Sequence, residues 1–477
     1  MRRKPVIAIV PLGHYIYFEQ FEGLREELMR KAGEFLPYLE DSAEIFVTEY
    51  VDTVERAFQV VRSLRQQDVD GVFMLLTTYL PSSLAAPFAN YLGDVPQVLV
   101  GIQPLAHLDY ANCTTYMQLV NDDICAMPEI AGVYGRLGRA IPPCIVAASQ
   151  QEEDIRAKVR AWQRAMVAKA AFKYAQFGYL GHTYEGMYDM HTDPTAFSGA
   201  FRAHVKMLEM CELDKLAQAV SAEDIAQKIA VIRETFSIQD PSIDPLTDYV
   251  RDEDLEWSAR MACALDAMVE KNDLTALAYY YKGEGGNLYE RMGAALILGN
   301  TLLTSSGIPL AGEADLKTAA TMLIMNRLGG GGSFAELHPF DIEGNCVLIG
   351  HDGPHNIAIS QGKPILRKLK KYHGKSGSGI GVEFSLRAGD ISMLSMNCQA
   401  NGRFKLVAAA GVSLPGAIPQ TGNTNTRVAI PGMNVCEFIR RWCEAGPTHH
   451  LALGTGNRLL EIRCFARLMG LDLEVIE

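Results

Sequence analysis

The sequence has no long apolar run and no excess of positive charge. No segment approaches the roughly 18 uninterrupted apolar residues that a membrane-spanning helix needs. The 56 acidic residues outnumber the 44 basic ones and give a formal net charge of −12. This is the wrong sign for binding the phosphate backbone of a nucleic acid or an anionic membrane surface. We therefore predict that the protein binds neither nucleic acid nor a membrane.

A cysteine pattern typical of a zinc site or of a disulfide framework is also missing. The ten cysteines are scattered along the chain and form no CxxC pair. Secreted disulfide-rich proteins are normally far denser in cysteine and much shorter. The basic start Met1–Lys4 resembles the beginning of a signal peptide, but the apolar stretch after it is short and contains Pro11. We expect buried thiols in a cytoplasmic protein.

What the sequence does contain is typical of an ordinary globular protein. Apolar residues make up 48% and charged residues 21% of the 477 residues, and 42 glycines and 21 prolines are spread along the chain. A domain usually takes roughly 100–200 residues. The length therefore predicts about three folded units.

The first part of the chain, residues 1–171, alternates strand-like and helix-like segments. The β-branched run Val6–Val10 ends in a Pro-Leu-Gly turn, and Phe18–Lys31 then carries apolar residues at helical spacing. Further strands are expected at 44–47, 71–76 and 97–101, with a helix at 51–67. This alternation predicts a Rossmann-like domain with a parallel sheet covered by helices. No GxGxxG motif follows the first strand, so the fold does not imply a dinucleotide.

Two further domains are expected after residue 171. Helical stretches at 207–215, 222–235 and 252–271, with a strand at 275–281, predict a second α/β domain over residues 172–332. From Ser333 onward, short β-rich runs alternate with Gly and Asn turns. The predicted fold class is therefore α/β: two Rossmann-like α/β domains with a parallel sheet, followed by a mostly β, barrel-like C-terminal domain over residues 333–477.

Residues that can bind a metal gather in the last third of the chain. Glu313 begins a predicted helix, Glu336 follows a turn of four glycines, and His351 ends a predicted strand. Six of the eleven histidines also lie there, at positions 338, 351, 355, 373, 449 and 450. Two carboxylates and two imidazoles suit a hard-to-borderline divalent cation such as manganese. Each residue also has a structural explanation, for example Glu313 as a helix N-terminal residue that the helix dipole favours.

Four motifs follow one another in this region. They are Gly312-Glu313, Gly331-Gly332-Ser333-Phe334-Ala335-Glu336, Val347-Leu348-Ile349-Gly350-His351 and Ala445-Gly446-Pro447-Thr448-His449-His450. In this order they resemble the L-arabinose isomerase family and, more loosely, its L-fucose isomerase relatives. The resemblance implies an aldose–ketose sugar isomerase of carbohydrate metabolism. It also implies that Mn²⁺, or another divalent cation, is held by four residues, Glu313, Glu336, His351 and His450.

The chemistry of such an isomerase explains these residue types. The C2 proton of an aldose is a poor acid, so the enzyme must polarise the carbonyl and stabilise the enediolate that forms. A divalent cation that chelates O1 and O2 supplies the necessary charge. Glu313 and Glu336 are the expected general base and general acid, and the sequence leaves open which does which. Of the adjacent histidines, His450 matches the family ligand, and His449 is expected to point away from the metal.

The expected substrate is an unphosphorylated aldose. Ligands of open α/β sheets bind beyond the carboxyl ends of the strands, where the candidate substrate-binding residues are His14, Tyr79, Asn121 and Asp122. These side chains are neutral or acidic and would repel a phosphate dianion. The family carries an Asn-Gln-Thr-Ala-His run where this chain has Asn121-Asp122-Asp123-Ile124-Cys125, an added acidic pair, so the sugar need not be arabinose.

The resemblance also implies a homo-oligomer, a trimer-based hexamer in which the first domain of a neighbouring subunit completes each cleft. Two other functions stay open at this point. A catalytically silent sugar-binding homologue could keep the fold, although two costly buried carboxylates disfavour it. Another metal-dependent enzyme of the same enediolate chemistry, an epimerase or an aldolase, would need the same residues.

Overall fold

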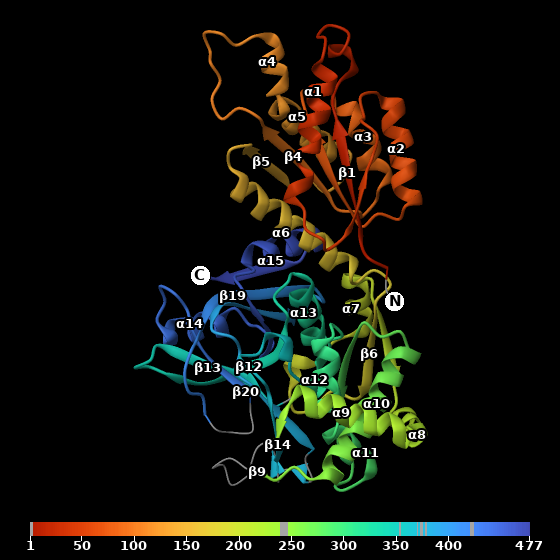
Figure 1. The fold of residues 1–477 in the computed structure, drawn as a ribbon, viewed down its shortest axis with the longest axis vertical. Helices are drawn as coiled ribbons and strands as arrows, with labels where there is room; N and C mark the ends of the chain where they lie inside the picture. The colour runs from red at the N-terminus through yellow and green to blue at the C-terminus, as the bar shows by residue number, and fades with distance from the viewer. Residues whose placement is uncertain are drawn as a thin grey trace. The chain divides into compact units, whose positions relative to one another are not determined.

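The computed structural model describes residues 3–238, 247–352, 354–369, 371–372, 375–376, 379–419 and 424–477. The chain forms two units, Met1–Ala170 and Ala171–Glu477 (Figure 1). None of the described helices combines the length and the apolar composition needed to cross a membrane. The division into three domains at residues 171 and 332 stays a prediction.

A parallel sheet forms the centre of the first unit, as predicted. Its strands are β1 (Val6–Leu12), β2 (Glu44–Val47), β3 (Gly71–Leu76), β4 (Gln97–Gln103) and β5 (Cys144–Ala148). Their order is β2-β1-β3-β4-β5, and all neighbours run parallel. β1 and β3 are buried along their whole length, as expected for apolar strands covered on both faces. The strand order reverses between β1 and β3, which is where ligands of open α/β sheets usually bind.

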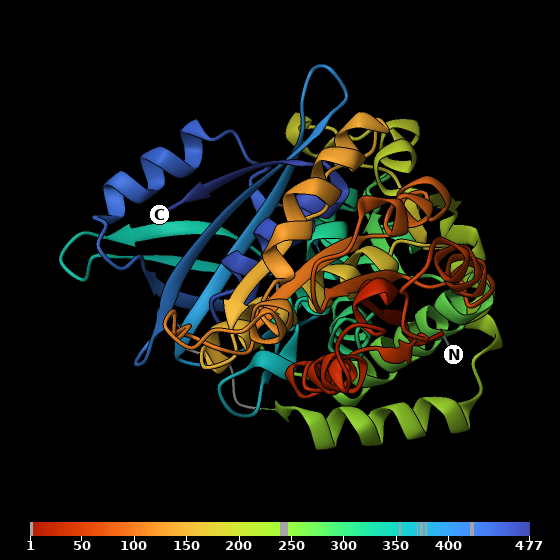
Figure 2. The ribbon, with the colours of Figure 1, turned by 90° about the horizontal axis from the view of Figure 1, so that it is seen from above.

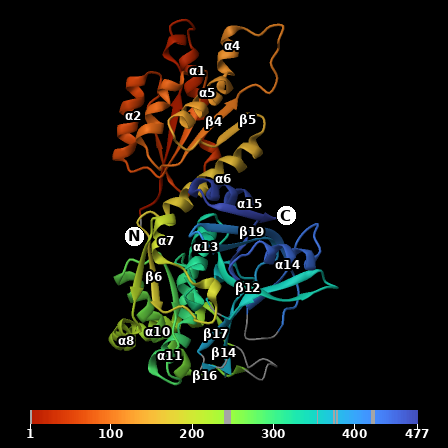
Figure 3. The same cartoon turned by 180° about the vertical axis from the view of Figure 1, so that it is seen from behind.

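Helices pack around this sheet (Figure 3). They are α1 (Leu24–Gly33), α2 (Val54–Gln66), α3 (Ala86–Tyr91), α4 (Thr115–Val120), α5 (Asp123–Arg136) and α6 (Glu152–Ala170). The sequence of α2 explains its position. The Thr53 side chain caps its first turn, and apolar residues at positions 57, 60, 61 and 64 form one buried stripe in the core of this unit.

The second unit begins with another parallel sheet, in the order β11-β10-β6-β7. Its strands are β6 (Gln176–Gly181), β7 (His204–Leu208), β10 (Ala276–Tyr280) and β11 (Leu310–Ala311). The helix predicted from residue 207 is wrong at its start, because Met207 and Leu208 pair with β6 and α8 begins only at Met210. The helices are α7 (Pro194–Phe201), α8 (Met210–Ala219), α9 (Ala222–Thr235), α10 (Asp252–Lys271), α11 (Leu288–Ala294), α12 (Ile297–Ser305) and α13 (Leu316–Arg327).

A closed six-stranded antiparallel barrel follows, which confirms the predicted barrel-like region. Its strand order is β18-β21-β12-β13-β20-β19, and pairing between β18 and β19 closes the circle. The hairpin of β12 and β13 projects from the barrel (Figure 2). The barrel strands are β12 (Ser333–Asp341), β13 (Cys346–His351), β18 (Gly389–Cys398), β19 (Phe404–Leu414), β20 (Thr424–Ala429) and β21 (His450–Thr455).

Smaller elements complete the second unit. β22 (Asp472–Ile476) runs parallel to β19, outside the closed circle. A separate small sheet has the order β17-β14-β8, and β9 also pairs with β14. These elements are β8 (Ser237–Ile238), β9 (Thr247–Asp248), β14 (Ile365–Leu369), β15 (Lys371–Tyr372), β16 (Lys375–Ser376), β17 (Ile380–Glu383), α14 (Val435–Glu444) and α15 (Leu459–Met469).

Helix α13 connects the parallel sheet of the second unit to the barrel. It contacts β10 and also β18 and β21. Its residues from Leu316 to Met325 are all buried, so it lacks the polar face of a surface helix. The start of this buried helix is therefore held in place by both β-structures, and the candidate site lies there.

Candidate metal centre

Three of the four predicted metal ligands come from neighbouring barrel strands. Glu336 on β12 lies directly opposite His450 on β21 and opposite Gly350 on β13, the residue before His351. Adjacent strands are about 4.8 Å apart, so this register brings the Glu336 carboxylate beside the His450 imidazole, and His351 joins them from the end of β13. Ligand atoms of Glu336, His351 and His450 lie within 4.8 Å of one another.

Glu313 reaches the same histidine from the parallel sheet. It follows β11 in the 3-10 turn η5 (Gly312–Ala314), where φ is +56° at Glu313 and +58° at Ala314. This left-handed backbone costs a non-glycine residue about 1–3 kcal/mol. The strained backbone is at the residue whose carboxylate reaches the cluster: Oε2 of Glu313 lies 3.2 Å from Nε2 of His450.

The charges in this cluster favour an ionised glutamate. Burial alone would raise the pKa of Glu313, but His450, His351 and His449 outweigh it and lower this pKa below its usual value. Burial likewise lowers the pKa of the fully buried His450, whereas Asp315 and Glu313 raise it by more. A carboxylate that binds a metal must be deprotonated, and the lowered pKa of Glu313 favours this form.

Four ligand-type atoms of the cluster are buried and have no hydrogen-bond partner within the described part of the chain. They are Oε2 of Glu313, Nδ1 of His351, Nε2 of His449 and Nε2 of His450. Buried polar atoms are nearly always paired in folded proteins. Carboxylate oxygen and imidazole nitrogen are together suited to a divalent cation of the hard-to-borderline class. The residues present therefore fit the cation that the sequence predicts, and the ligand set itself stays a prediction.

Asp315 orients His450, a role that the sequence did not reveal. It caps α13, and its Oδ1 accepts hydrogen bonds of 3.1 Å from the backbone N–H groups of Lys317 and Thr318. Its Oδ2 lies 3.1 Å from Nδ1 of His450. Although burial raises the pKa of Asp315, Lys317 and His450 hold it well below its usual range. A carboxylate only accepts, so Nδ1 carries a hydrogen, and Nε2 is the nitrogen that would face a metal.

Lys317 anchors this arrangement from a fully buried position. Its Nζ donates to the carbonyl of Met190 at 2.8 Å and to the hydroxyl of Thr192 at 3.0 Å. It also lies 3.8 Å from Oδ1 of Asp315. The ammonium thus ties the loop after β6 to the cap of α13. A carboxylate two residues after Glu313 and a lysine two residues later were the only signals in the sequence.

His449 does not turn away from the cluster, in contrast to the expectation from the sequence. Its ring centroid lies 3.9 Å from that of His450. One ring nitrogen lies within 4.8 Å of ligand atoms of both Glu313 and His450. Its Nδ1 is 2.6 Å from Oδ2 of Asp189, in the 3-10 turn η4 (Tyr188–Met190).

The remaining histidines of the C-terminal region have other surroundings. The ring of Phe334 packs against both His351 and His450, at centroid distances of 4.5 and 4.4 Å. Nε2 of His338 lies 3.9 Å from the Glu336 carboxylate. His355 is fully buried against Phe384, and burial lowers its pKa to about 3, which keeps it neutral. His373 lies outside the described residues.

In the first unit, two predicted substrate residues meet at the switch point of the sheet. His14 follows β1, and its ring lies edge-on to that of Tyr79, which follows β3, with a centroid distance of 6.5 Å. Both are partly exposed, and burial lowers the pKa of His14. The hydroxyl of Tyr79 donates to Glu129 at 3.4 Å. Neutral polar rings therefore line the place where this fold usually binds a ligand.

The other two predicted substrate residues differ from each other. Asn121 is buried and uses its amide internally, since Oδ1 accepts from the Leu105 N–H at 2.9 Å and Nδ2 donates to the Met117 carbonyl at 2.8 Å. Asp122 is partly exposed, and burial raises its pKa. Asp123, the second member of the acidic pair, is fully buried in an ion pair with Lys31, so it is not available to a sugar.

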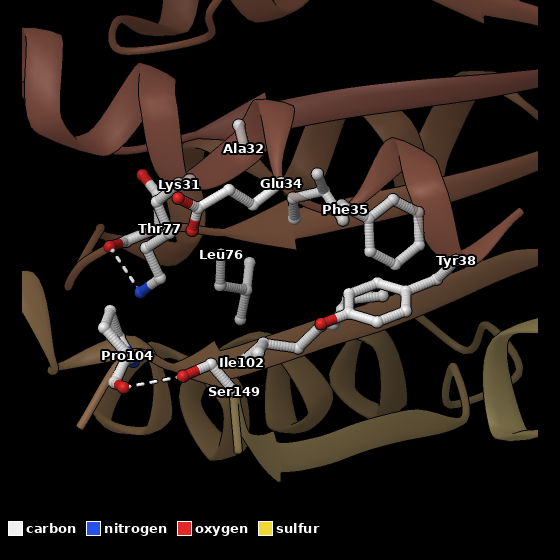
Figure 4. A pocket seen from close by; sticks show the side chains of 12 residues that line it. Lys31, Ala32, Glu34, Phe35, Tyr38, Leu76, Thr77, Ile102, Pro104 and Ser149 are labelled. Carbon is white, nitrogen blue, oxygen red and sulfur yellow. Dashed lines mark hydrogen bonds between the residues drawn. The ribbon is translucent and has the colours of Figure 1, made fainter. Parts of the chain in front are cut away.

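A hollow beside this ion pair encloses about 440 Å³, including space open to solvent (Figure 4). It lies at the ends of β3 and β4, and Phe35, Leu76 and Ile102 line its apolar part. Two of its polar side chains have protein partners. Nζ of Lys31 donates to the Thr77 carbonyl at 3.1 Å, and the Ser149 hydroxyl donates to the Pro104 carbonyl at 2.7 Å (Figure 4).

Comparison with known proteins finds similarity to sugar isomerases, as the sequence motifs do. No model of a protein family matches the chain. It is 24% identical over 415 residues to the L-arabinose isomerase of Acidothermus cellulolyticus, covering 85% of this chain and 80% of that protein. The L-arabinose isomerase of Aeromonas hydrophila is also 24% identical over 415 residues, which cover 85% of this chain and 81% of that protein.

A relative with another name matches a shorter part. The sulfoquinovose isomerase of Alkalicoccus urumqiensis is 23% identical over 338 residues, covering 70% of this chain and 72% of that protein. The relatives named here are sugar isomerases, and the two L-arabinose isomerases named above each match 85% of this chain. The chain is therefore related to the L-arabinose isomerase family over most of its length.

Proposed function

We propose that this protein is an aldose–ketose isomerase that uses a divalent cation, with manganese as the first candidate, and acts through an enediol intermediate. The observation that carries the proposal is the cluster of buried ligand-type atoms around His450, which form no hydrogen bond with the described residues although Oε2 of Glu313 and Nε2 of His450 lie 3.2 Å apart. The relatives named as sugar isomerases support the reaction class. Four residues would hold the cation: Glu313, Glu336, His351 and His450.

A cation bound there would polarise the substrate carbonyl and stabilise the negative charge that develops as the C2 proton leaves. The chain itself supplies the proton transfers. Glu313 and Glu336 approach the site from different elements, the turn after β11 and strand β12. Two carboxylates that reach one substrate from two directions suit a general base and a general acid. Phe334 and the buried histidines exclude water from one side, which strengthens these interactions.

We further propose that the sugar is unphosphorylated. His14, Tyr79 and Asp122 at the sheet ends of the first unit offer neutral rings and a carboxylate, which disfavour a phosphate dianion. Under this proposal the first unit of a neighbouring copy contributes these residues, in a hexamer. A cytoplasmic location is supported by the ten cysteines, all of which are free, although only Cys346 and Cys464 are buried, so the expectation of buried thiols is wrong for the others. The division into domains 1–171, 172–332 and 333–477 belongs to the same proposal.

Product analysis by NMR tests the reaction class. The full chain is stripped of metal, loaded with MnCl₂ and incubated with L-arabinose, D-galactose, L-fucose, sulfoquinovose and available 6-phosphates. A ketose formed from an unphosphorylated aldose is the expected result. An epimer would indicate an epimerase, cleavage to two fragments an aldolase, and binding without turnover a silent homologue. A clear preference for a phosphorylated sugar would contradict the proposed substrate class.

A further inference from the structure

A carboxylate follows directly after His351, the residue that ends strand β13. Nδ1 of His351 lies 3.1 Å from Oδ1 of Asp352, and the two side chains are 8% and 22% exposed. This distance is within the range of a hydrogen bond, although Nδ1 forms none with the described residues. The ring torsion of a histidine has a broad energy minimum. A small rotation of the imidazole can therefore align its Nδ1–H group with the carboxylate.

The other predicted imidazole ligand has the same neighbour at the same ring atom. Nδ1 of His450 lies 3.1 Å from Oδ2 of Asp315, to which it donates a hydrogen bond. The rings of His351 and His450 are close, with centroids 5.2 Å apart, and both pack against Phe334. Metal-binding histidines almost always donate their second N–H to an outer carboxylate, carbonyl or water. Each of the two predicted imidazole ligands thus has such a carboxylate beside Nδ1.

This neighbour determines which nitrogen of His351 remains for a cation. A carboxylate only accepts hydrogen bonds, so it favours the tautomer of the neutral ring that carries its hydrogen on Nδ1. Nε2 then has the lone pair that a metal needs. The position of the ring fits this role, because one of its nitrogens lies within 4.8 Å of ligand atoms of both Glu336 and His450.

We propose that Asp352 is a positioning residue, which holds His351 through Nδ1 and directs Nε2 of this imidazole toward the divalent cation. The inference rests on the metal requirement of the proposed function. It leaves the set of four ligands and the positions for substrate oxygens unchanged. It also assigns a role to Asp352, which lies one residue beyond the motif that ends at His351.

Asp352→Asn tests this role without removing a ligand. The amide has nearly the same size, but it can also donate to the ring, so it no longer enforces the Nδ1–H tautomer. Calorimetric titration of the metal-free full chain with Mn²⁺ should show an affinity about 10–100-fold weaker than wild type, with thermal unfolding of the metal-free protein unchanged. Glu343→Gln is the matched control, because Glu343 is exposed on the hairpin of β12 and β13 and should leave the affinity unchanged.

Long-range ¹H–¹⁵N spectra of the histidine-labelled chain report the tautomer, with the His351 signals assigned from a His351→Gln variant. At alkaline pH the metal-free wild type should carry the hydrogen on Nδ1, and Asp352→Asn should gain the Nε2–H form. With Zn²⁺ as a diamagnetic probe, the wild type should bind through Nε2. Unchanged affinity or tautomer in Asp352→Asn, or Zn²⁺ on Nδ1, would overturn the inference and leave the metal requirement intact. A wild type that binds no cation would overturn both.

Discussion

Both units bury a lysine beside an aspartate, but the surroundings of the two pairs differ. In the first unit, Lys31 pairs with Asp123 and also donates to two backbone carbonyls, of Thr77 and Val120, at 3.1 Å each. The lysine is fully satisfied by the protein. The second oxygen of Asp123 is unpaired, yet Asp123 belongs to no metal-ligand cluster in the part of the chain that the structure describes.

In the second unit, the corresponding pair is Lys317 and Asp315. Here the hydrogen bonds extend beyond the pair, because Oδ2 of Asp315 also accepts a hydrogen bond from Nδ1 of His450. The other ring nitrogen of His450, Nε2, lies 3.2 Å from Oε2 of Glu313 and has no hydrogen-bond partner among the described residues. The comparison teaches that a buried charged pair alone does not identify a functional site. A functional site is indicated when a hydrogen-bond network leads to a cluster of ligand-type atoms that have no hydrogen-bond partner among the described residues. The first pair should therefore matter for stability and the second for metal binding and catalysis.

The largest expected effect comes from Glu336→Gln. The amide can neither bind a metal as an anion nor move a proton, so kcat should fall by several orders of magnitude while the protein stays folded. Steady-state isomerisation assays and thermal unfolding measure both properties. Glu343→Gln is the control, because Glu343 is exposed on the same hairpin and should leave kcat unchanged. A near-normal rate for Glu336→Gln would place the catalytic group elsewhere.

A smaller effect separates the two adjacent histidines. His450 belongs to both clusters of ligand atoms, whereas His449 belongs to one. His450→Ala should therefore weaken Mn²⁺ binding more than His449→Ala, which calorimetric titration of the two variants can measure. If His449→Ala were the more damaging change, the order of importance inferred from the structure would be reversed.

For the first unit, Lys31→Met should lower stability rather than metal affinity. Breaking a buried pair by removing one partner typically costs about 3–5 kcal/mol, because the remaining charge is uncompensated. Urea unfolding measures this change. The double variant Lys31→Met/Asp123→Leu should recover much of the loss, since both charges are gone. Lys4→Met removes an exposed ion pair with Asp41 and serves as the control, with no measurable change expected.

The same pair predicts a pH effect. Burial raises the pKa of Asp123 to about 6, although Lys31 opposes this. A carboxyl whose folded pKa lies above its unfolded value of about 3.9 is favoured in its protonated form by folding, so its contribution to stability falls as the pH rises from about 4 to 6. Without Lys31 this pKa should rise further. The stability deficit of Lys31→Met should therefore be larger at pH 8 than at pH 5.

The sequence predicted the architecture where local patterns decide it. Buried β-branched runs such as β1 indicated the parallel sheet, and short strands between Gly and Asn turns indicated the barrel. Strand β7 was missed because Met207 and Leu208 fit a helix as well as a strand, and only pairing with β6 distinguishes the two. Closure of the barrel through β18 and β19 likewise depends on a register that no local pattern contains.

At the candidate site, sequence motifs indicated the ligands but not the groups that orient the adjacent histidines His449 and His450. Asp189 is 260 residues from His449 in the sequence, and Asp315 is 135 residues from His450. No local pattern links residues so far apart. The ion pair of Asp123 could not be foreseen for the same reason, because its partner Lys31 lies 92 residues away. The sequence shows which residues can ionise, and the fold decides which are paired.

Metal removal and restoration test the central claim most directly. The full chain is treated with a chelator, its metal content is verified, and turnover of an aldose that the untreated protein isomerises is measured before and after Mn²⁺ is added back. We expect turnover to disappear and to return, because the unpaired atoms around His450 need a cation to support the chemistry. Undiminished turnover in a verified metal-free sample would contradict the account.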